Sequence, residues 1–414
     1  MEKFTLQNGL TVLVEPMPYL RSVSLGVWVK AGSMLESREE NGLSHFMEHM
    51  AFKGTEHRTA RQIAEEMDCI GGQLNASTSK LCTNYYAKVI DEDLPLAADI
   101  LADMVCRPAL DEEELNKERG VVLEEIAMVE DNPEDVVYDV LAEAVFGQQS
   151  LGQTILGPKE KIAAYTAKDL RAFRQRHYGP QNAVVALAGN VEASRARELM
   201  EQYFGSWQGA AGEEFPQATA IPEPKKLSRD KDTEQVHLCV SFRSHEMGSD
   251  QVYPTAVLNN ILGGGMSSRL FQRIREELGM AYTVYSGPSS YPHCGEFTVY
   301  AATSPRHLKT VLEQMDIEIK KLLDGGVTEK EFQMSKAQLK SSFILGLESA
   351  YNRMSALGHN QILLNRVIPP EDTIAAIEKV TMEDVMASAQ TILTGPRAYA
   401  VVGRKAEKYL SAMR

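Results

Sequence analysis

The sequence predicts an α+β fold of two homologous domains, each a mostly antiparallel sheet packed with helices. Strand-like and helix-like segments are mixed, without the regular alternation of a parallel α/β protein. Short segments also recur in the same order at a nearly constant spacing. A stretch containing Gly and Pro separates two halves of about 200 residues, a usual domain size.

The chain has 414 residues, of which 43% are hydrophobic and 24% are charged. These values are close to globular averages and exclude disordered and low-complexity classes. The net charge of −14 argues against a nucleic-acid surface and against binding to anionic membranes. Five scattered cysteines without a C-x-x-C pair favour reduced thiols over a disulfide scaffold or a zinc ribbon. Neither a signal sequence nor an apolar membrane span is recognised, so a cytoplasmic location is expected.

Three pairs of segments carry the repeat, at an offset of about 215 residues. They are Asp111–Leu115 with Thr328–Phe332, Thr166–Leu170 with Thr381–Val385, and Ala183–Gly189 with Ala398–Gly403. Their common order favours a duplicated domain over coincidence. We expect an N-terminal domain at 1–207, a linker at 208–233 and a C-terminal domain at 234–414.

In the first half, Asn8-Gly9 predicts a type I′ hairpin turn within Phe4–Val14. The helix expected at Asp111–Glu130 has Asp111 as its N-cap, with Glu114 completing a capping box. The other expected elements are strands at Ser22–Val29 and Tyr85–Ile90, and helices at Leu94–Val105 and Ala167–His177.

The second half repeats this mixture of strands and helices. Its expected elements are a strand at Val236–Phe242, a helix at Pro254–Leu262, strands within Tyr282–Thr303, and helices from His307 onward.

The most informative motif is H-x-x-E-H, formed by His45, Glu48 and His49. On a helix these three side chains share an arc of about 100°, and the apolar neighbours face the other way. Two imidazoles one turn apart can bind one Zn²⁺, and the glutamate can take a proton from water. On the motif alone, a solvated or core-satisfied histidine pair stays open as the alternative.

A catalytic zinc needs a third protein ligand, and the acidic helix offers Glu118, Glu124 and Glu125. Glu118 and Glu125 are two turns apart and share a face, whereas Glu124 points away from Glu118. One carboxylate as ligand and one as outer support would fit this pair. An ordinary acidic helix surface is the alternative.

Three segments in order resemble the pitrilysin/insulinase family of zinc metallopeptidases. They are Gly42–Thr55, Glu118–Ile126 and Ser268–Tyr282. The resemblance covers nearly the whole chain and is strongest to the short, two-domain members akin to mitochondrial processing peptidase and its bacterial relatives.

The resemblance implies a zinc endopeptidase with one Zn²⁺ per chain. By the family pattern, the ligands would be His45, His49 and Glu125, and Glu48 would be the general base. Glu118 falls on the family's additional acidic residue, which supports the site.

Two substrate-binding features are also implied by the resemblance. The segment Gly71–Thr78 is similar to the family's edge strand, where Asn75 and Ala76 would pair with an extended peptide. Arg275 and Tyr282 match an Arg/Tyr pair that would hold a peptide carbonyl and stabilise the oxyanion. A plain strand, a surface arginine and a core tyrosine are the simpler interpretations.

The second half is expected to be a degenerate copy. The repeat aligns the zinc motif with Asn260, Gly263 and Gly264, and the two glutamates with Ser335 and Ser342. This half would then cover the site and hold substrate.

An endopeptidase acting on peptides or unfolded segments is therefore the expected function. The alternatives are an inactive structural or assembly subunit, a partner-dependent subunit and a non-peptidase zinc hydrolase. In the long family members four such domains close a chamber, so a two-domain chain would form half of a clamshell. The resemblance thus implies a homodimer in which Arg275 and Tyr282 act on the partner's site.

Overall fold

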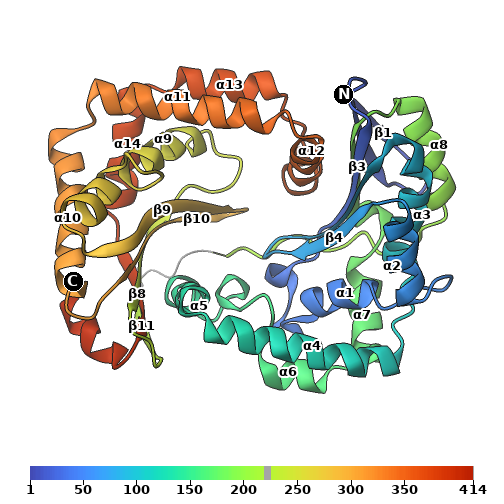
Figure 1. The fold of residues 1–414 in the computed structure, drawn as a ribbon, viewed down its shortest axis with the longest axis horizontal. Helices are drawn as coiled ribbons and strands as arrows, with labels where there is room; N and C mark the ends of the chain where they lie inside the picture. The colour runs from blue at the N-terminus through green and yellow to red at the C-terminus, as the bar shows by residue number, and fades with distance from the viewer. Residues whose placement is uncertain (219–224, 414) are drawn as a thin grey trace. The chain divides into compact units, whose positions relative to one another are not determined.

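The structure is a computed structural model that describes residues 1–218 and 225–413. The chain forms two compact units, each with its own sheet and its own hydrophobic core (Figure 1). Unit 1 comprises Met1–Ile126, Gln153–Pro216 and Ile344–Ile368. Unit 2 comprises Ala127–Gly152, Gln217–Phe343 and Pro369–Arg414.

Unit 1 has a six-stranded sheet in the order β1-β2-β6-β3-β5-β4. Neighbouring strands are antiparallel except for β2 and β6, which are parallel. The strands are β1 (Glu2–Thr5), β2 (Thr11–Pro16), β3 (Ser22–Val29), β4 (Gln73–Thr78), β5 (Thr83–Ile90) and β6 (Ala183–Gly189).

Side chains along β3 point alternately to the two faces of the sheet, and each face packs against a different cluster of residues. Val23, Leu25 and Val27 face the main core, whereas Trp28 faces Met354 and its neighbours on α12. The helices of this unit, with most of α4, are α1 (Leu43–Ala51), α2 (Ala60–Cys69), α3 (Leu94–Cys106), α4 (Glu112–Asp131), α6 (Lys159–Ala164), α7 (Ala167–His177), α8 (Ala193–Phe204) and α12 (Ala350–Leu364).

Unit 2 has a five-stranded sheet in the order β7-β11-β8-β10-β9. Only β7 and β11 are parallel. This order and these directions repeat those of β2-β6-β3-β5-β4, which supports the duplication inferred from the sequence. The strands are β7 (Lys226–Asp230), β8 (Val236–Ser244), β9 (Ala281–Tyr291), β10 (Cys294–Thr303) and β11 (Arg397–Gly403).

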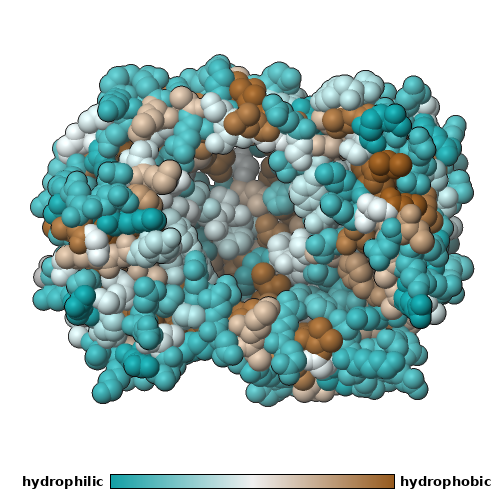
Figure 2. Space-filling view, in the orientation of Figure 1, coloured by the Kyte–Doolittle hydropathy of each residue, from teal (hydrophilic) through white to brown (hydrophobic). Residues whose placement is uncertain are grey.

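The helices of unit 2, with most of α11, are α5 (Pro133–Phe146), α9 (Val252–Leu262), α10 (Leu308–Gly325), α11 (Glu329–Gly346), α13 (Pro370–Lys379) and α14 (Met382–Leu393), with a π-helical segment η6 (Phe271–Glu277). The face of Figure 2 is mostly hydrophilic, with separate hydrophobic patches, as expected when apolar side chains lie in internal cores. No helix in the described ranges has the length and apolar character needed to cross a bilayer.

One helix of each sequence half packs in the unit built mainly from the other half. Helix α5 packs on β7, β8 and β11 of unit 2, although it precedes the second half in the chain. Helix α12 packs on β3 and β6 of unit 1, although it lies in the second half. The two halves have therefore exchanged equivalent helices.

Part of the expected linker is sheet, not connection. Residues 226–230 of the segment 208–233 form β7, which pairs with β11. The sequence of this strand, KLSRD, is mostly charged and polar, so it lacks the apolar pattern by which strands are recognised in a sequence. The repeated sheet thus begins before residue 234. Residues 219–224, including Pro222 and Pro224, lie outside the described residues.

The hairpin within Phe4–Val14 is present, but the prediction of a type I′ turn is wrong. Gly9 has φ 93°, whereas Asn8 is not among the described residues with positive φ. The Gly9 N–H donates to Leu6 C=O at 3.0 Å, as in a type I turn followed by a glycine bulge. Asn8 instead donates from Nδ2 to Phe204 C=O at 2.8 Å, which holds it in place.

The other expected strands and helices are found with shifts of one or two residues at their ends. Asp111 caps α4, since its Oδ1 accepts the N–H groups of Glu113 and Glu114. The predicted reciprocal capping box is absent among the described contacts, because the Glu114 carboxylate pairs with Lys117 at 2.6 Å.

Candidate metal centre and active site

Helix α1 is fixed at its N-terminus by a buried carboxylate. Its N-cap residue Gly42 has φ 99°, which favours glycine, and offers no side chain for capping. Glu36 takes that role, accepting the N–H of Gly42 at 2.8 Å and of Ser44 at 2.6 Å. Burial raises the pKa of Glu36 more than these hydrogen bonds lower it. The beginning of the motif-bearing helix is thus held from outside the helix.

The predicted segregation of faces along α1 is present. Phe46 and Met50 are buried in the core of unit 1. His45 is 7% exposed, and Glu48 and His49 are partly buried on the other side. The segment therefore forms one helix that has an apolar face and a face of ligand-type side chains.

Helix α4 brings Glu125 to the two histidines. Its Oε2 lies 3.5 Å from His45 Nε2 and 3.2 Å from His49 Nε2. One ligand atom from each of the three residues lies within 4.8 Å of the others, so the group could hold a metal ion. Glu124 is exposed on another face of α4, as the helical spacing predicts.

The donor set and its spacing fit Zn²⁺. A tetrahedral zinc with ligand bonds of about 2.0–2.2 Å separates its ligand atoms by about 3.3–3.6 Å. The 3.2 and 3.5 Å separations around Glu125 are close to this range. Two imidazoles and one carboxylate also leave a fourth position open, as in catalytic zinc sites.

Glu118 orients one of the two imidazoles. Its Oε1 lies 2.7 Å from His49 Nδ1, and its Oε2 accepts from Lys53 Nζ at 2.6 Å. Burial raises the pKa of Glu118, but the hydrogen bonds from His49 and Lys53 lower it further, to below its usual value. Nδ1 of His45 has no hydrogen-bond partner within the described chain. The supporting role predicted for Glu118 therefore has a geometric basis at one histidine.

The imidazoles and carboxylates of this group also shift one another's pKa values. Burial lowers the pKa of His49, but the Glu118 hydrogen bond and the charges of Glu125, Glu118 and Glu48 raise it overall. A hydrogen bond with His45 lowers the pKa of Glu125, although burial opposes it. A cation would take the place of the shared protons.

Glu48 has a hydrogen-bond partner that the sequence analysis missed. Thr78, at the end of β4, donates from Oγ1 to Glu48 Oε2 at 2.5 Å. The only sequence feature related to this contact is the alternation of side chains along β4, which places Thr78 on the same side as Ala76. Nothing in the sequence showed that this side faces α1.

The predicted substrate strand lies at a sheet edge. β4 pairs with β5 and is the last strand in the order of the first sheet. Asn75 is exposed and Ala76 is partly buried, opposite Tyr86 and Tyr85 of β5. An edge strand can accept an extended peptide, so the geometry is compatible with the predicted role.

Arg275 and Tyr282 are brought together in unit 2. The Arg275 guanidinium carbon lies 4.6 Å from the ring centroids of both Phe271 and Tyr282. The Tyr282 side chain is 74% exposed, contrary to a core tyrosine. The zinc-type group lies in unit 1, so the catalytic role of this pair stays a prediction.

The degenerate copy needs a corrected alignment. The helix equivalent to α1 by topology is α9, which ends at Leu262, so Gly263 and Gly264 lie beyond it. A constant offset failed because the segment between the equivalent strands differs in length. The sequence of α9, VYPTAVLNNIL, has no His, Asp, Glu or Cys, and Ser335 on α11 is no carboxylate. Helix α9 therefore supplies none of the ligand-type residues that α1 contains.

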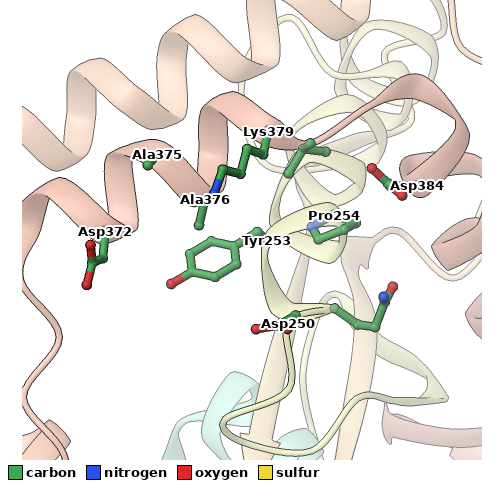
Figure 3. A pocket seen from close by; sticks show the side chains of 10 residues that line it. Asp250, Tyr253, Pro254, Asp372, Ala375, Ala376, Lys379 and Asp384 are labelled. Carbon is green, nitrogen blue, oxygen red and sulfur yellow. The ribbon is translucent and has the colours of Figure 1, made fainter.

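A hollow in unit 2 lies between the start of α9 and α13 (Figure 3). Its lining includes Asp250, Tyr253, Asp372, Lys379 and Asp384. The Asp384 carboxylate is occupied in capping α14. This hollow contains none of the predicted site residues.

His45, His49 and Glu125 form a candidate metal site with the donor set that catalytic zinc sites use, and the comparisons with known proteins identify the family. The pattern of the family described as Insulinase (Peptidase family M16) matches residues 11–159, and that of the Peptidase M16 inactive domain matches residues 164–339. The chain belongs to the M16 peptidase family.

Full-length relatives support this membership. The uncharacterized zinc protease YmxG of Bacillus subtilis is 43% identical over 97% of this chain and 98% of its own length. An uncharacterized zinc protease of Streptomyces coelicolor is 37% identical over 100% of this chain and 92% of its own length.

Solved structures share the fold. A protease from Helicobacter pylori has a TM-score of 0.90 at 23% identity, covering 97% of this chain and 99% of that chain. A Pseudomonas fluorescens structure described as a peptidase M16 inactive domain also has a TM-score of 0.90, at 21% identity, covering 97% and 98%. The predicted α+β class with two helix-packed sheets is confirmed.

Proposed function

We propose that the protein is a zinc-dependent endopeptidase that cleaves peptides or unfolded segments. The convergence of His45, His49 and Glu125 beside Glu48 carries this proposal. The relatives named zinc proteases support it.

In this proposal His45, His49 and Glu125 hold the zinc, and Glu118 keeps His49 in its ligating orientation. When bound, zinc lowers the pKa of a water molecule and polarises a carbonyl. Glu48 lies one residue before His49, on the ligand face, so it can accept the proton of the attacking water. It would then deliver that proton to the leaving amine. β4 would align the peptide through backbone hydrogen bonds, with Asn75 and Ala76 beside the scissile bond.

An inactive structural or assembly subunit is the competing function. The words "inactive domain" belong to the pattern that matches residues 164–339. His45, Glu48, His49 and Glu125 all lie within residues 11–159, the part matched by the insulinase pattern. The intact set of ligand and base residues therefore favours an active enzyme.

Metal analysis and peptide cleavage test the proposal together. The purified protein should contain about one zinc per chain and cleave a quenched fluorescent peptide library, and chelation should abolish both. Glu48→Gln should retain zinc and lose cleavage, whereas His45→Ala should lose zinc. Glu124→Gln, an exposed change on α4, is the matched control. Normal cleavage by Glu48→Gln would refute the mechanism.

We further propose that two copies pair, and that Arg275 and Tyr282 of one copy act at the zinc site of the other. Helix α9 supplies no ligand-type side chain, so unit 2 offers this pair no comparable site of its own, and the exposure of Tyr282 leaves it accessible to a second copy. Substrate peptides would be enclosed between the copies.

Mixing two inactive variants tests this pairing. Glu48→Gln retains Tyr282, and Tyr282→Phe retains Glu48, so a mixed dimer would contain one complete site. Equal mixing after subunit exchange should then restore about a quarter of wild-type activity. If activity stays at the level of the separate variants while mixed dimers form, Tyr282 does not act across the pair.

A further inference from the structure

We propose that Thr78, with Thr83 behind it, is a positioning residue that holds the Glu48 carboxylate in place for proton transfer. This inference rests on the proposed function, in which Glu48 is the general base. It assigns to β4 a second role besides peptide binding.

The contact between Thr78 and Glu48 is short and specific. The Thr78 hydroxyl donates to Glu48 Oε2 at 2.5 Å, between residues 30 positions apart in the chain. Thr78 is the one side chain in the described ranges with a hydrogen bond to this carboxylate. Hydrogen bonds to ionised acceptors are about twice as strong as neutral ones. Thr78 therefore selects one position for a side chain that could otherwise rotate.

Thr83 lies directly behind Thr78. The two hydroxyl oxygens are 3.0 Å apart, and their residues pair across β4 and β5. Thr83 is fully buried, and its hydroxyl donates to the Ala31 C=O at 2.8 Å. Each hydroxyl has one proton, which Thr78 donates to Glu48 and Thr83 donates to Ala31, so the 3.0 Å contact between them is a packing contact that confines the Thr78 side chain. Thr83 is itself held by the backbone of the same unit.

Two buried tyrosines lie near this pair of threonines. The hydroxyls of Tyr85 and Tyr178 are 2.9 Å apart, and both side chains are buried. Burial raises the pKa of both phenols, so they remain uncharged. Buried networks whose members are hydrogen-bonded hold their groups in one arrangement.

The location of Thr78 joins the substrate strand to the base. Asn75 and Ala76, predicted to pair with the peptide, lie three and two residues before it on β4. One strand would therefore set both the scissile bond and the carboxylate that serves it. A hydroxyl can also rotate to accept, so the contact with Glu48 survives when the carboxyl carries the proton. Such placement of reacting groups contributes to the rate through orientation.

The test compares Thr78→Val, which keeps the shape and removes the hydroxyl, with Thr78→Ser, which keeps the hydroxyl. Thr255→Val is the control, because it removes a buried hydroxyl in α9 that bonds Gln251 C=O and contacts Ser388. Cleavage of one peptide, zinc content and thermal unfolding are measured for each variant.

Thr78→Val should lower kcat about tenfold or more, with KM and zinc content unchanged. Thr78→Ser should recover kcat to within about threefold of wild type. Thr255→Val should leave kcat unchanged. Full kcat in Thr78→Val, an equal loss in the Ser and Val variants, or loss of zinc in Thr78→Val would each overturn the inference. The wild-type protein and Glu48→Gln, assayed alongside, test the proposed peptidase function separately.

Discussion

Replacing Glu118 by Gln is expected to weaken zinc binding without changing a ligand. The Glu118 carboxylate makes two charge-assisted contacts, to His49 Nδ1 at 2.7 Å and to Lys53 Nζ at 2.6 Å. A glutamine can serve only one of these two donors with its single oxygen. Losing one such hydrogen bond costs about 1.5–3 kcal/mol, and outer-shell partners are worth about 10–100-fold in metal affinity. We therefore expect the zinc Kd to rise about 10–100-fold.

The assay is competition with a chromophoric chelator as a function of pH. In the wild type, the raised pKa of His49 lets protons compete with the metal at a higher pH than they would at an unperturbed imidazole. Removing the Glu118 charge lowers the pKa of His49, so protons compete less with zinc in the variant than in the wild type. The ratio of the variant's zinc Kd to the wild-type Kd should therefore become smaller as the pH falls. Glu124→Gln on the same helix should match wild type. An unchanged Kd for Glu118→Gln at pH 7.5 would refute the orienting role of this carboxylate.

Three further predictions concern stability. Gly358→Ala should destabilise the protein by about 1–3 kcal/mol in urea unfolding, because its Cβ would lie 2.2 Å from the Trp28 ring. Gly120→Ala in α4, with open space at its Cβ, should stabilise by up to about 1 kcal/mol, and the same sign for both would contradict the packing argument. Asp103→Asn should cost about 3 kcal/mol, since the buried carboxylate accepts from several neighbouring cationic and hydroxyl groups. Burial raises the pKa of Asp103, but these bonds lower it below 3.8 overall. Its contribution is thus present above about pH 3.8 and disappears on further acidification, which acid unfolding of wild type and variant can check.

Local patterns predicted the elements that carry the candidate centre. The four-residue spacing of His45 and His49 and the seven-residue spacing of Glu118 and Glu125 were sufficient to place each pair on one helical face. That α1 and α4 lie against each other was expected only from the resemblance to the family, because the periodicity of one helix does not show which other helix packs against it.

Features that depend on tertiary contacts were missed. Glu36 caps α1 from outside the helix, and Thr78 reaches Glu48 from a strand, so neither shows a sequence-local signature. The type I′ turn failed because Asn8 is held by Phe204, far along the chain. The apolar side chains of α12 predict that one face of this helix is buried. They do not show which of the two sheets it packs against, because both sheets have an apolar face.

The exchange of α5 and α12 has a consequence for synthesis of the chain on the ribosome. Unit 1 cannot be completed until residues 344–368 have emerged, although its sheet is encoded within the first 189 residues. Until then the surface around Trp28, which α12 covers in the finished protein, remains open to solvent or to other proteins. The nascent N-terminal half is thus a candidate client for chaperones that bind apolar surface.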